Sequence, residues 1–292
     1  MNFFPYHYLV SGLPDLEQNE LKAKRDMEAI QEWICDNLTP RDRRHFQFLI
    51  YRNDDKNLLY LMRKREGQKV SEIMTFHKPS VFSYQELEEG VNGLRDLPFY
   101  MARFMEEQKT VVAYMAGRPR ENRLVSLYYD AAFELDDSFI RKYFSFKRDL
   151  KNIVNSINAK KFGFSLNDVL IGNYELVDRI KKSSAPDFGL SITHPYTNEL
   201  LELIEIKDFK RLELKIDSIL RDYIDEITSK DRFDVSFIFG YFIKLTLGNR
   251  WLSLDAEKGI EKFNMAIRNI IRSGEWPDGF SRNWMEKEGA SV

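Results

Sequence analysis

Histidine, cysteine and paired carboxylates are the residue types best suited to catalysis or metal binding, and in this chain they are few and scattered. The four histidines are His7, His45, His77 and His194. None stands at a metal-ligand spacing from another histidine or from a cysteine, so we expect surface or structural histidines. Acid pairs such as Asp136–Asp137 and Glu88–Glu89 are typical of solvated helix ends. This pattern predicts neither a metal site nor a catalytic group.

Sequence motifs that bind phosphates or position a nucleophile are also absent. The chain has no G-x-x-x-x-G-K-[ST], no G-x-G-x-x-G and no G-x-S-x-G. We therefore expect no cofactor. The single cysteine, Cys35, excludes an intrachain disulfide framework and fits a reducing compartment. No histidine is near it in sequence, which favours a buried structural thiol over a nucleophile.

Two basic clusters are the remaining candidates for a functional surface. They are Arg41, Arg43 and Arg44 in one segment, and Arg118, Arg120 and Arg123 in another. The first cluster lies in the opening turns of an expected helix, where positive charge opposes the helix macrodipole, and the second lies in an expected turn. Either cluster could face an acidic partner, or each could be solvated surface paired with acids of the same chain.

The overall charge argues against nucleic acid or an anionic membrane as a partner. The 292 residues include 44 Lys and Arg and 46 Asp and Glu, for a net charge of −2, and the signs are interspersed. Neither arginine cluster alternates with aromatic residues, as a single-strand binding platform would. The N-terminal segment lacks the basic start and continuous apolar run of a secretory signal. We therefore expect a cytoplasmic protein.

The elements that must position these residues are expected to be helices. Residues 22–38 have apolar positions at the helical period, and Thr39, Pro40 and Asp42 form a helix-start signal. The segment 116–123 is interpreted as a turn and as the boundary between a region 1–120 and a region 121–292. The following 40 residues are expected to form two helices joined near Asp136–Asp137, or one long bent helix.

The C-terminal part also follows the helical period. Residues 208–227 are amphipathic, and residues 255–274 run from a capping aspartate to a glycine stop. Residues 6–13, a short apolar run, are interpreted as a strand, and residues 57–65 as a short helix or strand. The expected fold class is mainly α, a multi-helix bundle with at most a minor N-terminal β element.

The most apolar stretch, residues 233–251, must be either a membrane span or a core helix. A span needs about 20 predominantly apolar residues. The longest uncharged run here, VSFIFGYFI, is closed by Lys244, so a span is excluded. Val235, Ile238, Phe242 and Leu245 follow the helical period and predict a core helix. Gly240 and Gly248 mark expected points of close packing.

The stretch DLKNIVNSINAKKFGFSLNDVLIGNYELVDRI resembles the C subunit of V/A-type rotary ATPases, called subunit d in eukaryotic enzymes. That family carries an Asp-x-Lys-Asn run, an Arg-Ala-Lys and a Leu-Ile-x-Gly-type turn into the next helix. The matching positions are Asp149, Lys151, Asn152, Ala159, Lys160, Leu170, Ile171 and Gly172. Asn158 stands where the family usually has arginine.

The resemblance continues to about residue 275. RLELKID has the family's Leu-Glu-x-x-x-Asp pattern, and the helix that follows is similar at Tyr241, Lys244, Asn249 and Arg250. The family's glutamate between them is missing. Residues 1–120 match that subunit poorly, but they resemble a bacterial family of unknown function encoded in V/A-type ATPase operons. The resemblance there rests on the Tyr8–Asp15 run and the Thr39–Asp42 helix start.

These resemblances imply a non-catalytic, wholly helical peripheral subunit that couples the central shaft of a V/A-type ATPase to its membrane rotor ring. The implied partners are those ATPase subunits, and the implied location is the inner face of the cell membrane, reached through protein partners only. Two alternatives stay open. The first is an assembly or regulatory factor of the same complex. The second is a soluble enzyme, which carboxylates with raised pKa converging in a deep pocket would favour.

Overall fold

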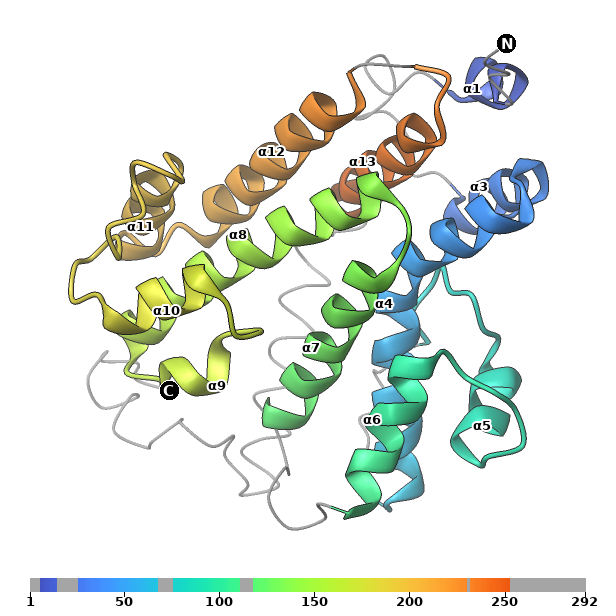
Figure 1. Cartoon of the computed structure of the whole chain (residues 1–292), viewed down its shortest axis with the longest axis horizontal. Helices are drawn as coiled ribbons and strands as arrows, with labels where there is room; N and C mark the ends of the chain where they lie inside the picture. Colours follow the sequence, from blue (N-terminus) through green and yellow to red (C-terminus); the bar gives the residue numbers. More distant parts are fainter. Residues whose placement is uncertain (1–5, 15–25, 68–75, 111–117, 230–231, 253–292) are drawn as a thin grey trace, which may run out of the picture.

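A computed structural model of the chain describes residues 6–14, 26–67, 76–110, 118–229 and 232–252 (Figure 1). These ranges contain twelve helices and no strand, which confirms the mainly α fold class. The first five are α1 (His7–Gly12), α3 (Met27–Asn37), α4 (Pro40–Arg65), α5 (Tyr84–Val91) and α6 (Phe99–Thr110). The others are α7 (Arg118–Glu134), α8 (Ser138–Phe162), α9 (Leu166–Val169), α10 (Glu175–Lys182), α11 (Thr197–Glu205), α12 (Phe209–Thr228) and α13 (Val235–Leu252).

Local capping signals set the boundaries of the longest helices. The Thr39 side chain accepts a hydrogen bond from the Asp42 amide, and Pro40 is the first residue of α4, as predicted. Asp137 caps α8 in the same way by accepting from the Ile140 amide. The break between α7 and α8 falls at residues 135–137, which confirms the two-helix interpretation of this stretch.

Two local predictions are wrong. Residues 7–12, expected as a strand, form α1, because the short apolar run buries Leu9 on one helical face. The segment 116–123, expected as a turn, enters helix α7 at Arg118. Pro119 is the second residue of α7, where its fixed φ and missing N–H suit a helix start. The helix expected over 255–274 lies outside the described residues.

Five helices close on one another to form the body of the molecule. α4 contacts α7, α7 contacts α8, α8 contacts α12, α12 contacts α13, and α13 contacts α4 again (Figure 1). We call this arrangement the closed bundle. Within it α8 is the most connected helix, because it also contacts α9, α10 and α11. Aromatic side chains of α4, α7, α8 and α13 pack together in the interior.

The apolar stretch is a core helix, as predicted. Ile238, Phe242 and Leu245 are buried on α13. At Gly240 an added Cβ would lie 2.8 Å from the Ile224 side chain on α12, so glycine is required for this close approach. None of the helices in the described ranges combines the length and the apolar character needed to cross a membrane.

The predicted boundary at residue 120 does not interrupt the packing. Phe46 of α4 contacts the rings of Phe239 and Phe242 of α13, and Phe48 stacks on Tyr128 of α7. One continuous hydrophobic cluster therefore joins both regions. The two regions therefore share one core, although separate domains usually have a core each. The division into 1–120 and 121–292 stays a prediction.

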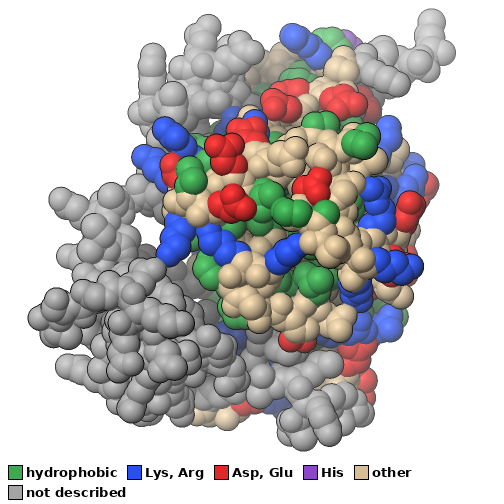
Figure 2. Space-filling view, turned by 90° about the vertical axis from the view of Figure 1, so that its left-hand side faces the viewer, with side chains coloured by type: hydrophobic (Ala, Val, Ile, Leu, Met, Phe, Trp, Pro, Cys, Tyr) green, Lys and Arg blue, Asp and Glu red, His purple; other side chains and the backbone are tan. Residues whose placement is uncertain are grey.

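The surface shows the interspersed charge that the composition predicts. Figure 2 shows the side of the molecule that lies at the left in Figure 1, near α10 and α11. Acidic, basic and hydrophobic side chains alternate on this face, and no single type forms one continuous area. Exposed apolar side chains are dispersed among charged ones on this face.

Candidate functional site

The first arginine cluster is only partly available to a partner. Arg41 is exposed and pairs with Asp136 at 2.8 Å, and Arg44 is exposed as well. Arg43 is half-buried, and its Nε atom has no hydrogen-bond partner in the described part of the protein. Exposed ion pairs such as Arg41–Asp136 add only about 0–1 kcal/mol to the free energy of unfolding. These side chains can therefore exchange one partner for another at little cost.

The second cluster pairs with acids of its own chain. Arg120 is buried and donates both terminal amino groups to Glu66, at 2.8 and 2.5 Å. Arg123 makes a similar two-point contact with Glu107, at 2.7 and 2.6 Å. These hydrogen bonds hold the pKa of both glutamates below their ordinary values. The side chain of Arg118 is outside the described part of the structure.

The Asp-x-Lys-Asn run and the turn that follows it pack as one unit. Asn152 is fully buried; its Nδ2 donates to the Ile171 carbonyl at 2.9 Å, and its Oδ1 accepts from the Ile171 amide at 2.8 Å. The Tyr174 hydroxyl donates to Asp149 at 2.6 Å and accepts from Asn152. Lys160 donates to the carbonyls of Ser184 and Ala185. Helix α8 therefore bonds one loop through Asn152 and a second loop through Lys160.

The remaining residues of the predicted pattern are dispersed. Lys244 of α13 forms an ion pair with Asp225 of α12 at 2.6 Å. Tyr241 is buried in the core. Lys151, the neighbour of Asn152 on α8, lines a cavity. The structure therefore groups Asp149 with Asn152 but leaves Lys160, Tyr241 and Lys244 at separate places.

The histidines and the cysteine also stay apart. His45 lies beside Asp137, and the backbone of His77 bonds Asn57. The ring of His194 shares a hydrogen bond with the Thr193 hydroxyl. The described residues contain no group of His, Cys, Asp and Glu that could hold a metal ion. Cys35 is half-buried, and burial raises the pKa of its thiol to about 11, so it stays protonated at neutral pH.

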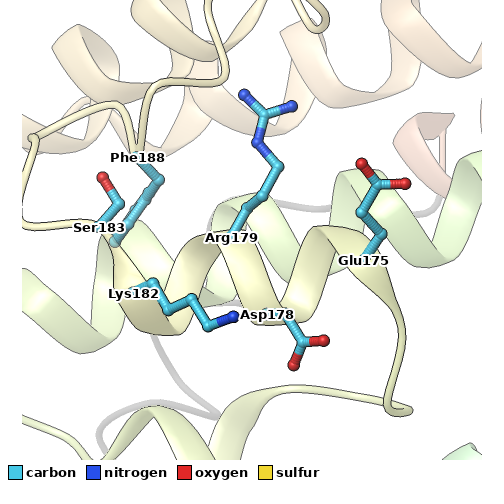
Figure 3. Close-up of a pocket in the computed structure, with 6 residues that line it drawn as sticks. All are labelled: Glu175, Asp178, Arg179, Lys182, Ser183 and Phe188. Atoms are coloured by element: carbon cyan, nitrogen blue, oxygen red, sulfur yellow. The ribbon is translucent and has the colours of Figure 1, made fainter.

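An open hollow over α10 is a weak candidate for a site. Figure 3 shows its lining residues, which are Glu175, Asp178, Arg179, Lys182, Ser183 and Phe188. In Figure 3 Arg179 and Glu175 extend upward from the helix, Asp178 extends downward, and Lys182 lies along the helix. Arg179 also donates to the Gly189 carbonyl. The hollow is wide open, and these polar side chains do not enclose a ligand.

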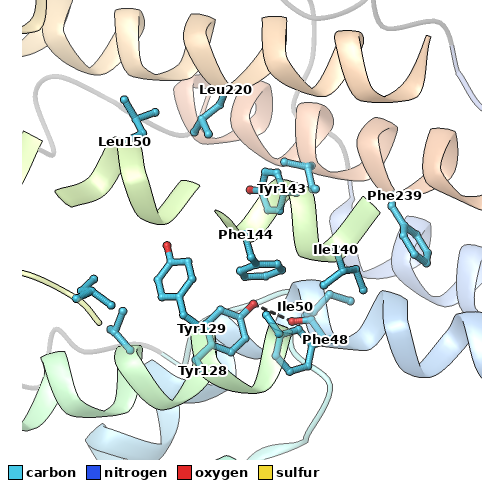
Figure 4. Close-up of a cluster of buried hydrophobic side chains, with 14 of the residues drawn as sticks. Phe48, Ile50, Tyr128, Tyr129, Ile140, Tyr143, Phe144, Leu150, Leu220 and Phe239 are labelled. Atoms are coloured by element: carbon cyan, nitrogen blue, oxygen red, sulfur yellow. Dashed lines mark hydrogen bonds between the residues drawn. The ribbon is translucent and has the colours of Figure 1, made fainter. Parts of the chain in front are cut away.

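The closed bundle contains a better-formed cavity of about 410 Å³. We call it the bundle cavity. All five helices of the closed bundle line it, and its polar lining residues are Arg52, Tyr128, Tyr129, Tyr143, Lys147, Lys151, Asn155, Glu213, Asp217 and Arg250. In Figure 4 the hydroxyls of Tyr129 and Tyr143 point toward the part of the core lined by Leu150 and Leu220. The size is within the range of small-molecule sites.

Charged side chains of both signs line this cavity. Arg52 pairs with the buried Asp55 at 3.1 Å, and Arg250 pairs with Asp217 at 2.7 Å and with Glu213 at 3.2 Å. Lys147 donates to the Tyr143 hydroxyl at 3.1 Å. Burial lowers the pKa of Lys147, the charges of Arg52 and Arg250 lower it further, and the charge of Asp217 opposes them. Cations and an acid therefore both act on Lys147 at the cavity.

A polar group on α4 was not predicted. Asp54 is fully buried and accepts from the amides of Val81 and Phe82, at 3.0 and 3.1 Å. Asn53 and Asn57 bond the backbone of Pro79 and His77. Together they hold the segment 76–83 against α4. The signal was present, because Asp54 and Asn57 occupy positions where the helical period of α4 calls for apolar residues.

Asp54 and Asp55 both have a raised pKa, but they do not converge on the bundle cavity. Asp55 accepts from the Tyr100 hydroxyl at 2.8 Å, and Asp54 faces the loop. Adjacent helix positions point in different directions. Neither carboxylate lines the cavity. The arrangement supports a structural role for both.

These two carboxylates predict a specific pH dependence of stability. Burial raises the pKa of Asp54 to about 7 and that of Asp55 to about 6, against about 3.9 in an unfolded chain. Between about pH 4 and 7 the folded state holds protons that the unfolded chain has released, so these groups lower the free energy of unfolding as pH rises. In the Asp54→Asn variant the free energy of unfolding should therefore fall less between these pH values, by on the order of a few kcal/mol.

Urea unfolding at stepped pH values measures this effect. The variant should show a shallower fall in the free energy of unfolding between about pH 4 and 7 than the wild type. Asp130→Asn makes the same substitution at an exposed position and serves as the matched control. Equal slopes for Asp54→Asn and the wild type would show that Asp54 does not take up a proton on folding.

Comparison with known proteins gives one match. The family model described as "Protein of unknown function (DUF2764)" matches residues 3–274. No curated protein and no solved structure matches the chain. These comparisons do not link the chain to the C subunit of V/A-type ATPases, so that resemblance stays a prediction. Since the family model covers nearly the whole sequence, the protein belongs to the DUF2764 family of proteins of unknown function.

Proposed function

We propose that this protein is a non-catalytic peripheral subunit of a V/A-type rotary ATPase, which couples the central shaft to the membrane rotor ring. The observation that carries the proposal is the pairing of Asn152 with Ile171. The two sequence elements that resemble the C subunit, 149–152 and 170–172, are thus one structural unit. Residues that match a family's pattern and also bond each other support a shared local fold.

The closed bundle suits a subunit that transmits torque. Phe48 of α4 stacks on Tyr128 of α7 at a centroid distance of 4.8 Å, and Phe144 packs edge-on against Tyr128 and Tyr143. Outside the bundle cavity, a packed aromatic interior of this kind has low compressibility. A body of this kind passes a force from one surface to another with little deformation. This property supports an adaptor placed between two moving parts.

Co-purification of the tagged protein from its native membranes tests the proposal directly. Under conditions that keep the ATPase intact, rotor-ring and shaft subunits should be recovered with it in fixed stoichiometry. Recovery in substoichiometric amounts would favour an assembly or regulatory factor instead. Recovery without any shaft or ring subunit would contradict both forms of the proposal.

The exposed part of the first arginine cluster is the proposed contact with an acidic partner. Arg41→Glu combined with Arg44→Glu should weaken association about tenfold at low salt, because surface charges contribute mainly through screened electrostatics. The difference from wild type should shrink as salt is raised. Binding to the isolated shaft and ring subunits, measured over a salt series, gives the result.

Lys181→Glu combined with Lys182→Glu is the matched control. It reverses two exposed charges on α10 and should leave association unchanged if Arg41 and Arg44 form the contact. Equal losses for both double variants would show a general charge effect and remove this surface from the proposal. Arg120 and Arg123 are unsuitable for such a test, because reversing either would break an internal ion pair.

A further inference from the structure

Lys147 occupies an unusual position in the closed bundle. It lies half-buried in the middle of α8 and lines the bundle cavity. Its ammonium group donates to the Tyr143 hydroxyl at 3.1 Å and lies 5.1 Å from the centre of the Tyr143 ring. In the described ranges no carboxylate lies within ion-pair distance of it. A lysine ammonium can donate three hydrogen bonds, so donor capacity is left toward the cavity.

Other donors reach the cavity from different helices. Arg52 on α4 gives one amino group to Asp55, and the rest of its planar guanidinium has further N–H donors. The Tyr129 hydroxyl comes from α7 (Figure 4). Donors that arrive from three helices suit a tetrahedral oxyanion, whose oxygens point in several directions, better than a planar carboxylate.

The pairing of charges at the bundle cavity favours an anion beside Lys147. Arg52 pairs with Asp55, and Arg250 pairs with Glu213 and Asp217. Lys147 has no such carboxylate partner among the described residues, and its charge faces the cavity. A cation in a partly desolvated site is unfavourable unless an anion compensates it. A phosphate group would supply that compensation.

The rest of the lining is apolar, which indicates that the ligand also has an apolar part. Val125, Leu150, Val154, Ile216, Leu220 and Leu247 form the remaining walls. A volume of about 410 Å³ is larger than a phosphate group requires. Apolar walls with a few convergent polar groups are typical of sites for small organic molecules.

We propose that the bundle cavity binds a small phosphorylated organic molecule, with Lys147, Arg52 and the Tyr129 hydroxyl contacting the phosphate group and the apolar walls contacting the remainder. This site is independent of the proposed ATPase role, since it rests on the cavity and its charges alone. It also lies away from Arg41 and Arg44, so the failure of one proposal leaves the other standing.

Binding measurements with three probes test the chemistry of the site. Phenyl phosphate, inorganic phosphate and benzoate are titrated into the full-length protein by calorimetry at constant ionic strength. Phenyl phosphate should bind most tightly, because only it offers both the phosphate and an apolar part. Tighter binding of benzoate would overturn the assignment to phosphate. No saturation by phenyl phosphate below about 10 mM would overturn the site itself.

Two lysine variants locate the binding. Lys147→Met keeps the length of the side chain and removes its charge, and it should weaken phenyl phosphate binding about tenfold or more. Lys142→Met makes the same change at an exposed position of α8 and should leave the affinity within about twofold. Equal affinity of the wild type and Lys147→Met would contradict the proposal.

A second measurement follows binding on the wild-type protein, and Lys147→Met serves only to assign the Lys147 signal. Reductive methylation with carbon-13 labels the lysines of the wild-type protein, and NMR then follows each labelled amine during the titration. The Lys147 signal should move with phenyl phosphate and saturate at the concentration found by calorimetry. A Lys147 signal that stays constant while binding saturates would place the ligand elsewhere and overturn the proposal.

Discussion

Phe46→Ala should lower the free energy of unfolding by about 3–5 kcal/mol. Phe46 is 0% exposed, and its ring lies 4.8 Å from that of Phe242 and 6.0 Å from that of Phe239. The substitution leaves a cavity where α4 meets α13, which is the contact that closes the bundle. Aromatic pairs add about 0.5–1.5 kcal/mol beyond burial, so the loss should lie in the upper part of this range.

Denaturant unfolding followed by circular dichroism measures the effect. Phe99→Ala is the matched control, because Phe99 is 77% exposed and its truncation should change stability by less than about 0.5 kcal/mol. The wild type and the Phe46 variant should each unfold in one transition, since residues on both sides of position 120 share the core. Two separate transitions in the wild type would instead support independent regions.

Asn152→Ala should lower the free energy of unfolding by about 2–5 kcal/mol. The alanine leaves the buried amide and carbonyl of Ile171 without their partners, and each unsatisfied group costs about 1–3 kcal/mol. The loss should be largest locally, because the same amide group also bonds the Tyr174 hydroxyl. The segment that returns to α8 would then open more often.

Hydrogen exchange at the Ile171 amide, combined with denaturant unfolding, measures this loss. Asn155→Ala is a graded control, since Asn155 makes one hydrogen bond, to the Val169 carbonyl, and is only half-buried. It should lower stability by about 0.5–1.5 kcal/mol. If the two variants lose equal stability, the two-way pairing with Ile171 does not anchor this segment.

Features encoded by neighbouring residues could be predicted from the sequence. The start of α4 depends on Thr39 and Asp42, which are three residues apart, so the cap is visible in any window of the chain. The close approach at Gly240 could be predicted because a glycine inside an apolar helical run usually marks a packing contact. The core face of α13 follows directly from its apolar period.

Features that depend on distant residues could not be predicted. Arg120 is an internal residue because Glu66, 54 positions earlier, lies opposite it in the folded chain. The bundle cavity likewise unites Arg52, Lys147 and Arg250, which belong to three helices. Pattern and propensity specify elements, whereas the pairing of elements depends on packing that a single sequence does not display.

The length of α8 has a mechanical consequence. Its 25 residues extend about 37 Å, and along them lie Lys147, then Asn152, then Lys160. Axial displacement of this helix would strain the attachments of the loops at 170–172 and 184–185 together, because both are bonded to the same rigid rod. A displacement at the middle of α8 would thus also move the loop bonded near its C-terminal end.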